Sequence, residues 1–272
     1  MAVRNAASWT PGAARATVEQ TGTLSGMQPD TESTDTGRRR AYRVAALLVT
    51  VVVAAAVVTA IISSGSTSEL RPGRPVPGAA RALALLRGIP QSEATLGDPQ
   101  APVTLVEFAD LQCPTCASFA EGALPQIIRR YVRSGQVRVI ISALDTIGHD
   151  SERAARVAYA IGEQDRLFQF VALMYANQGS ENTSYVTDVY LRALAYAIPG
   201  VNVGRALAAR NGVGPSRELA AARALASRFH VSATPSFLLY ATGAQPRRFS
   251  PEGLDAGAFS AAIQRLLQGG ST

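Results

Sequence analysis

The chain has 272 residues, enough for one sizeable domain with additional segments, and it contains only two cysteines. Its net charge is +6, and all 26 basic residues are arginines. Proteins that bind nucleic acids gather basic residues on one face. Here the one dense basic cluster, Arg38–Arg40 with Arg43, directly precedes an apolar block. The charge therefore argues against a nucleic-acid partner and indicates a segment at the cytoplasmic side of a membrane.

The N-terminal region divides into a polar segment and an apolar segment. Residues 1–43 lack an apolar period and are predicted to be disordered and cytoplasmic. Residues 44–63 include a 19-residue uncharged run, which as a helix spans about 28 Å, close to the roughly 30 Å hydrocarbon core. Arginines precede the run and none follows before Arg71, so the positive-inside rule places the rest of the chain outside the cytoplasm. An uncleaved transmembrane signal anchor is predicted, with a cleaved signal peptide as the alternative.

Residues 64–80 are rich in Ser, Gly and Pro and are predicted to form a flexible linker to a folded domain over 81–272. Within that domain, 103–109 and 137–143 are apolar runs typical of buried strands. Between them, apolar residues at helical spacing predict a helix, with a kink expected at Pro125. A strand, a helix and a second strand in this order predict a parallel βαβ unit.

The second half of the domain is predicted to be mainly helical. Helices are expected over 151–161, 163–177, 187–197, 203–210 and 216–229, separated by Gly and Pro. A third strand is expected at 236–241, a short edge segment at 247–250 and a closing helix over 254–267. A sheet interrupted by a helical insertion, at about 151–229, is an α/β architecture.

The two cysteines form a CxxC motif, Cys113-Pro114-Thr115-Cys116, between the first strand and the following helix. A helix N-terminus has unpaired N–H groups and a partial positive charge, which stabilise a thiolate. Cys113 is therefore predicted to be the attacking sulfur and Cys116 the resolving one. Taken alone, a CxxC also fits a metal site or a structural bridge. A structural zinc site normally needs four Cys or His ligands, which here would require a dimer.

Further residues extend the motif into a family resemblance. The stretch 96–119 (LGDPQAPVTLVEFADLQCPTCASF), together with Thr234-Pro235 in SATPSFLLY, resembles the DsbA-like thiol–disulfide oxidoreductases of thioredoxin-like fold. It is most similar to single-pass, membrane-anchored members from actinobacteria, and 149–155 and 178–188 also look like that group. The resemblance covers roughly residues 84–250. It implies a redox-active CxxC motif.

The resemblance also implies roles for three residues outside the motif. Pro235 is expected to be a cis-proline facing the cysteines, with the Thr234 backbone left to pair with an extended substrate. Glu107, the acidic residue in the first strand, is expected to relay a proton to Cys116, although it could also be a surface or salt-bridged residue. A carboxyl group buried in such a strand has a raised pKa unless it is paired. From its position just before the cysteine motif, Asp110 is expected to be a loop residue or a helix-capping residue.

The predicted function is disulfide formation in exported proteins by dithiol–disulfide exchange at Cys113 and Cys116, without a bound cofactor. The substrates are expected to be unfolded or reduced exported proteins. The resemblance implies a membrane-embedded, quinone-linked partner that reoxidises the pair. A thiol reductase of the same fold and a tethered chaperone or binding module remain the alternatives.

Overall fold

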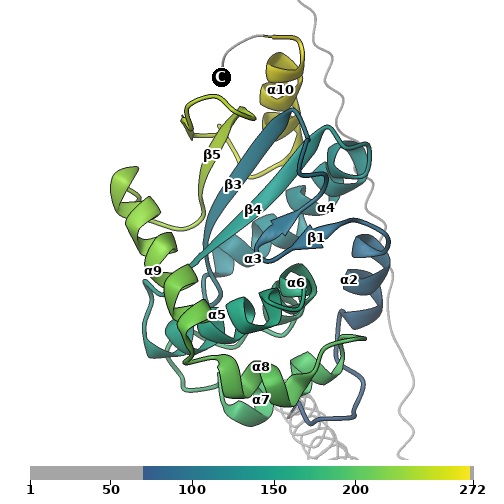
Figure 1. Ribbon diagram of the computed structural model, residues 1–272, viewed down its shortest axis with the longest axis vertical. Coiled ribbons are helices and arrows are strands. Elements are labelled where there is room, and N and C mark those ends of the chain that lie inside the picture. Colours follow the sequence, from purple (N-terminus) through teal and green to yellow (C-terminus); the bar gives the residue numbers. More distant parts are fainter. Residues whose placement is uncertain (1–69, 270–272) are drawn as a thin grey trace, which may run out of the picture. The chain divides into compact units, whose positions relative to one another are not determined.

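The computed structural model describes residues 70–269, and its framework is a six-stranded sheet in the order β1-β2-β4-β3-β5-β6 (Figure 1). The strands are β1 (Gln91–Ser92), β2 (Thr95–Leu96), β3 (Val103–Asp110), β4 (Val137–Leu144), β5 (Ser236–Ala241) and β6 (Arg248–Phe249). β3 pairs in parallel with β4 and antiparallel with β5. The predicted α/β fold with a parallel central pair is confirmed.

The central strand β3 is buried along its whole length, as expected for a strand with a neighbour on each side and helices on its faces. In the sheet register Glu107 lies beside Ile141 of β4 and Phe237 of β5. Side chains paired in this way point to the same face of a sheet. Glu107 is thus placed on the face that carries the aromatic core.

That face is covered by helices from both halves of the chain. They are α3 (Pro114–Glu121), α4 (Ala123–Ile127), the π-helical turn η1 (Ile128–Val132) and α10 (Ala256–Leu267). Phe119 of α3 packs on Phe237 and Phe259 with ring centroids 4.8 and 5.0 Å apart. This aromatic cluster fixes α3, and therefore the cysteines at its beginning, against the sheet.

The helix after the cysteines does not kink at Pro125, and that prediction is wrong. The break lies at Gly122, which separates α3 from α4. Pro125 lies in the first turn of α4. The N–H groups of a first turn have no partner within the helix, so the missing N–H of proline costs no hydrogen bond there. A proline near the start of a helix was mistaken for one in its interior.

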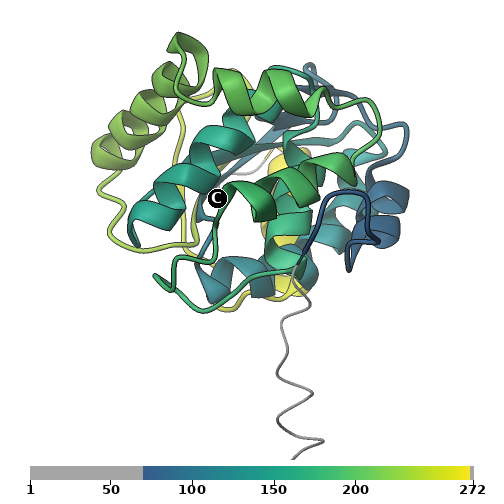
Figure 2. The same ribbon diagram turned by 90° about the horizontal axis from the view of Figure 1, so that it is seen from below.

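Between β4 and β5 the chain forms a group of helices. They are α5 (His149–Gly162), α6 (Leu167–Ala176), α7 (Asp188–Tyr196), α8 (Val203–Ala209) and α9 (Val213–Arg228). In Figure 1 α9 lies in front of the sheet and α4 behind it, and Figure 2 views the helical group from below. Tyr159 of α5 donates a hydrogen bond of 3.0 Å to the Ala143 carbonyl of β4. The helical group is thus joined to the sheet by buried polar contacts as well as by apolar ones.

The folded part begins before the predicted boundary at Arg81. Helix α2 (Ala79–Leu86) packs against α6, and Val76 ahead of it is buried. The predicted disordered segment and signal anchor lie outside the described residues. Among residues 70–269, no helix combines the length and the apolar character needed to cross a bilayer.

Candidate active site

The two cysteines lie where β3 leads into α3. Cys113 is the N-cap residue of α3, with an extended backbone, and Pro114 occupies the first helical position. Proline is tolerated there because its φ suits the helix and no N–H is required. Cys113 is 7% exposed and Cys116, one turn later, is fully buried. An attacking nucleophile therefore reaches Cys113 more readily than Cys116.

The Cys113 sulfur is surrounded by hydrogen-bond donors. The Cys116 side chain provides the strongest one, and the Thr234 side chain and the backbone N–H groups of Cys116 and Thr115 add to it. Against the opposing effect of burial, these bonds lower the pKa of Cys113 from 9.0 to about 5. In its thiol form Cys113 donates to the Thr234 carbonyl oxygen at 3.3 Å. At neutral pH the donors hold Cys113 as a thiolate.

Cys116 has the opposite character. Burial raises its pKa far above the usual range, and its hydrogen bond to Cys113 and the nearby Glu107 carboxylate raise it further. The proton thus stays on Cys116 and is shared toward the Cys113 thiolate. The two sulfurs differ in acidity for identifiable structural reasons, which is the condition for one to attack and the other to resolve.

Glu107 is buried in β3, with 1% of its surface exposed, and it is not a surface residue. Its Oε1 atom has no hydrogen-bond partner among the described residues. Burial, followed by repulsion from Cys113, raises the pKa of this carboxyl group to about 8. It is therefore largely protonated at neutral pH and close enough to both sulfurs to interact with them electrostatically.

Thr234 and Pro235 reach the cysteines from a distant part of the sequence. The Thr234–Pro235 peptide bond is cis, and it precedes β5. A groove of about 340 Å³ begins at Thr115, Thr234 and Pro235 and continues along β5 and β6 to Leu254. The structure thus brings together Cys113, Cys116, Glu107 and this dipeptide, the five residues singled out from the sequence, and places a groove beside them.

The structure also shows a buried polar network that sequence reasoning missed. Asp110 is fully buried at the end of β3, and it does not cap a helix. Its carboxylate accepts hydrogen bonds from the side chains of Ser151 and Thr146 and from the backbone N–H groups of Ile147 and Gln112, at 2.6–3.1 Å. These donors tie the loop before Cys113 to the loop between β4 and α5.

The same loop is held on its other side by the helical group. Tyr175 donates to the Asp110 carbonyl at 3.2 Å and Gln178 to the Leu111 carbonyl at 3.2 Å. The Gln112 side chain donates to Ser151 and accepts from the Asn182 backbone, at 2.8 and 2.9 Å. Asp and Gln are mostly exposed in proteins and Tyr is intermediate, so only their contacts across the fold reveal this role.

The chain has two histidines, His149 and His230. His149 begins α5, and neither Asp150 nor Ser151 caps that helix, since its N-cap is Gly148 without a side-chain bond. The carbonyl of His230 accepts a hydrogen bond from Arg248. Within residues 70–269 no cluster of three or more His, Cys, Asp or Glu side chains is arranged to hold a metal ion.

Comparisons with known proteins agree with this geometry. The family model described as thioredoxin matches residues 91–245, more than half of the chain. A protein of Bacillus cereus named probable disulfide bond formation protein D is 31% identical over 115 residues, 41% of this chain and 53% of the relative. Disulfide bond formation protein D of Bacillus subtilis is 28% identical over 107 residues, 39% of this chain and 48% of the relative. The chain spans about half the length of these curated relatives.

Solved structures show the same fold. Oxidised BdbD of Bacillus subtilis superposes with a TM-score of 0.57 at 19% identity, covering 73% of this chain and 99% of that one. Alpha-DsbA1 of Wolbachia pipientis gives a TM-score of 0.55 at 21% identity, covering 69% and 96%. The chain therefore belongs to the thioredoxin family, and the part that the structure describes has the fold of its DsbA-like members.

Proposed function

We propose that this chain is an extracytoplasmic thiol–disulfide oxidoreductase that forms disulfides in exported proteins. The observation that carries the proposal is the difference in acidity between the two sulfurs. Cys113, at the helix N-terminus, has a pKa of about 5, whereas burial keeps Cys116 protonated. A stabilised thiolate favours the reduced form of the pair, so the disulfide form gives up its bond readily to a substrate.

The reaction consists of two thiol–disulfide exchanges. A substrate thiolate attacks the Cys113 sulfur of the disulfide, the Cys113–Cys116 bond breaks, and Cys116 leaves with the electron pair and takes up a proton. A second substrate thiolate then attacks the substrate sulfur of the mixed disulfide, and Cys113 leaves as a thiolate. The substrate loses two electrons and two protons. The protein gains the two electrons and one proton, which stays on Cys116, while Cys113 remains a thiolate and the second proton goes to solvent.

In this proposal Glu107 supplies the proton that Cys116 takes up. Its carboxyl group has a pKa of about 8, so it carries a proton at neutral pH and lies within electrostatic range of Cys116. A buried Cys116 thiolate would be costly without a proton donor nearby, because burial disfavours the charged sulfur. The Oε1 atom of Glu107 has no hydrogen-bond partner among the described residues, so the carboxyl group is available for this transfer.

The substrate is held in the groove beside the cysteines. Thr234 lies at one end of the groove, and its carbonyl contacts the Cys113 sulfur. An extended segment of a reduced polypeptide would lie along this wall beside β5, with its cysteine facing Cys113. The names of the Bacillus relatives support disulfide formation over reduction or a chaperone role.

The cellular setting is part of the proposal. A signal anchor at residues 44–63, as in membrane-anchored actinobacterial members, would place the catalytic domain outside the cytoplasm, where disulfides persist. Reoxidation would then fall to a quinone-linked membrane partner. Protease treatment of intact cells would degrade residues 70–269 while an epitope at the N-terminus survives. Protection of both regions would contradict this topology.

The direction of electron flow is tested by the reduction potential. The Cys113–Cys116 pair is equilibrated with glutathione buffers, and the oxidised fraction is measured by thiol alkylation. A value near the −120 mV of strongly oxidising proteins is expected, and a value near −270 mV would indicate a reductase instead. A Cys113→Ser variant serves as the control and must lose exchange activity. Full activity in that variant would favour a chaperone or binding role.

A further inference from the structure

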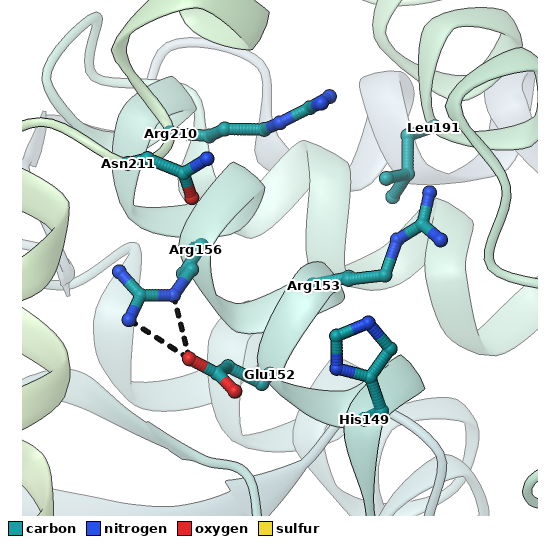
Figure 3. A pocket seen from close by; sticks show the side chains of 7 residues that line it. All are labelled: His149, Glu152, Arg153, Arg156, Leu191, Arg210 and Asn211. Atoms are coloured by element: carbon teal, nitrogen blue, oxygen red, sulfur yellow. Dashed lines mark hydrogen bonds and ion pairs between the residues drawn. The ribbon is translucent and has the colours of Figure 1, made fainter.

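The described part of the chain has a second cavity, of about 260 Å³, within the helical group. It lies between α5, α7 and the end of α8, and arginine side chains dominate its lining (Figure 3). Arg153 and Arg156 come from α5, together with His149 and Glu152, and Arg210 follows α8. Positions 149, 152, 153 and 156 are spaced by three and four residues, so they share one face of α5.

The charges in this cavity do not balance. Glu152 pairs with Arg156 at 2.8 Å. Arg153 and Arg210 both donate to a single oxygen of Asp188, at 3.0 and 2.9 Å. Three guanidinium groups thus meet two carboxylates, which leaves one positive charge without a counterion among these groups.

The same two arginines have unused donors. Each guanidinium has five N–H donors, and among the described residues Arg153 and Arg210 each donate only to Asp188. Their side chains are 36% and 30% exposed, so they are held in place but remain reachable from solvent. The cavity therefore offers N–H donors and a net positive charge to an incoming anion.

We propose that this cavity, formed around Arg153 and Arg210, binds a carboxylate group of the polypeptide substrate. Guanidinium groups match carboxylates geometrically and bind them through paired N–H donors. Pockets for drug-sized ligands and cofactors have volumes of about 300–1,000 Å³, so a cavity of about 260 Å³ suits one acidic side chain or a C-terminal carboxylate. A bound carboxylate would also neutralise the remaining positive charge.

The position of the cavity connects it to the cysteines. Ser151, between His149 and Glu152 on the first turn of α5, contacts Asp110 and Gln112, and Gln112 directly precedes Cys113. On α5, Ser151 lies opposite the face formed by positions 149, 152, 153 and 156, so the cavity and the loop of residues 111–113 (the redox loop) lie on two sides of the first turns of this helix, separated by roughly the 10–12 Å width of a helix. An extended chain advances about 3.3 Å per residue, so about four or more residues would be needed to connect a cysteine at Cys113 to an acidic residue in the cavity. This inference rests on the proposed function, which supplies the polypeptide.

The test compares reduced dithiol peptides that are neutral except for one Glu, placed two to eight residues from the nearest cysteine. Each has a partner peptide with Gln in place of Glu. The oxidised full-length chain is mixed with each peptide, and the second-order rate of peptide oxidation is measured by acid quenching and mass spectrometry. At one or more spacings the Glu peptide is expected to react about fivefold to tenfold faster than the Gln peptide, and the ratio should approach one in 1 M salt.

The decisive variant replaces Arg153→Gln, Arg210→Gln and Asp188→Asn together, which removes both donors without leaving an unpaired carboxylate. It lowers the net charge by one, as does the control Arg265→Gln on the exposed surface of α10. The triple variant should lose the preference for Glu while its rate with the Gln peptide stays within twofold of wild type. The control should keep the preference.

Three outcomes would overturn the inference. Equal rates for Glu and Gln peptides at every spacing would leave the proposed function standing but the cavity without this role. Loss of the preference in Arg265→Gln would assign it to overall charge. Failure to oxidise any peptide would contradict the proposed function itself.

A second measurement does not depend on the variant folding. The wild-type chain is titrated with a cysteine-free peptide containing Glu, with its Gln partner and with acetate, while the arginine Nε–H signals are followed by NMR. Shifts of the Arg153 and Arg210 signals with the Glu peptide alone are expected. Equal shifts at equal concentrations of acetate would indicate a small-anion site and would overturn the assignment to substrate.

Discussion

Two residues of the candidate site, Glu107 in β3 and Cys113 at the beginning of α3, have pKa values moved in opposite directions for different reasons. Donors around its sulfur lower the pKa of Cys113 to about 5, and burial raises that of Glu107 to about 8. At neutral pH the thiol is thus ionised while the carboxylic acid is not. A thiol is usually a weaker acid than a carboxyl group, and here the order is reversed. The site therefore holds a stabilised thiolate, Cys113, that leaves readily from a disulfide, and a proton donor, Glu107.

Glu107→Gln is expected to make the reduced protein more stable, and increasingly so as pH rises. The unfolded carboxyl group loses its proton near pH 4.5 and the folded one near pH 8. Between these values the folded state alone holds the proton, so the free energy of unfolding falls as pH rises in the wild type. Above pH 8 the gain in the variant should be on the order of a few kcal/mol.

Urea unfolding at pH 5 and pH 8.5 measures this effect, with Glu121→Gln on the exposed surface of α3 as the control. The variant should also oxidise thiol substrates at least about tenfold more slowly than the wild type, since proton transfer typically contributes about 10²–10⁴ in rate. Equal stabilisation at both pH values would contradict the raised pKa of Glu107.

The acidity of Cys113 is expected to depend on side chains contributed by Cys116 and Thr234. The absorbance of the thiolate at 240 nm should titrate near pH 5 in the reduced protein. Cys116→Ala removes the strongest donor and should raise the midpoint most, and Thr234→Val should raise it less. Thr115→Val should leave it unchanged, because Thr115 contributes its backbone N–H. A Thr234→Val midpoint equal to wild type would remove that hydroxyl from the explanation.

At the scale of elements, long segments with a periodic pattern were predictable from the sequence, whereas very short strands and breaks within helices were not. The runs at 103–109 and 137–143 show apolar β-branched sequences, and the structure has strands there. The two-residue strands β1 and β2 have no period and were missed. The break at Gly122 and the π-helical turn η1 were also missed. They lie in a segment that packs against α10 and β4, and local sequence does not show these contacts.

The candidate site divides in the same way. The cysteines, Glu107 and Thr234-Pro235 could be singled out because motif and resemblance marked them. For Cys113 only the direction of the pKa shift could be predicted. The helix N-terminus was visible in the sequence, but the hydrogen bond from the Cys116 side chain was not. Asp110 was misinterpreted because its four donors come from residues up to 41 positions away.

Asp110→Asn tests the connection between the redox loop and its neighbours. The carboxylate accepts four hydrogen bonds, and an amide in its place loses the charge and turns one acceptor into a donor. A loss of at least about 2 kcal/mol in the free energy of unfolding is expected, because buried donors are left unpaired. Asp98→Asn, whose carboxylate accepts from Gln100 in an exposed turn, should cost less than about 1 kcal/mol. Similar losses in both variants would contradict a special role for Asp110.

At the scale of the whole described domain, the sheet and the helical group share one hydrophobic core rather than two. β5, α3 and α10 contribute the aromatic cluster, and α5–α8 join the core through buried residues such as Leu194 and through the polar network at Asp110. The redox loop lies at this junction and is held from both sides. Its geometry therefore depends on the two parts remaining folded together.

Residues 70–269 are accordingly expected to unfold as a single cooperative unit. Phe119→Ala, in the aromatic cluster, and Leu194→Ala, in the helical group, both remove fully buried side chains. Each should cost roughly 2–5 kcal/mol and shift the whole urea transition, whether it is followed by far-ultraviolet circular dichroism or by alkylation of Cys116. If Leu194→Ala instead split the transition, with helical signal lost while Cys116 stayed protected, the helical group would be a separate folding unit. The contacts of Ser151, Tyr175 and Gln178 with the redox loop oppose that outcome, because the loop cannot keep them once the helices unfold.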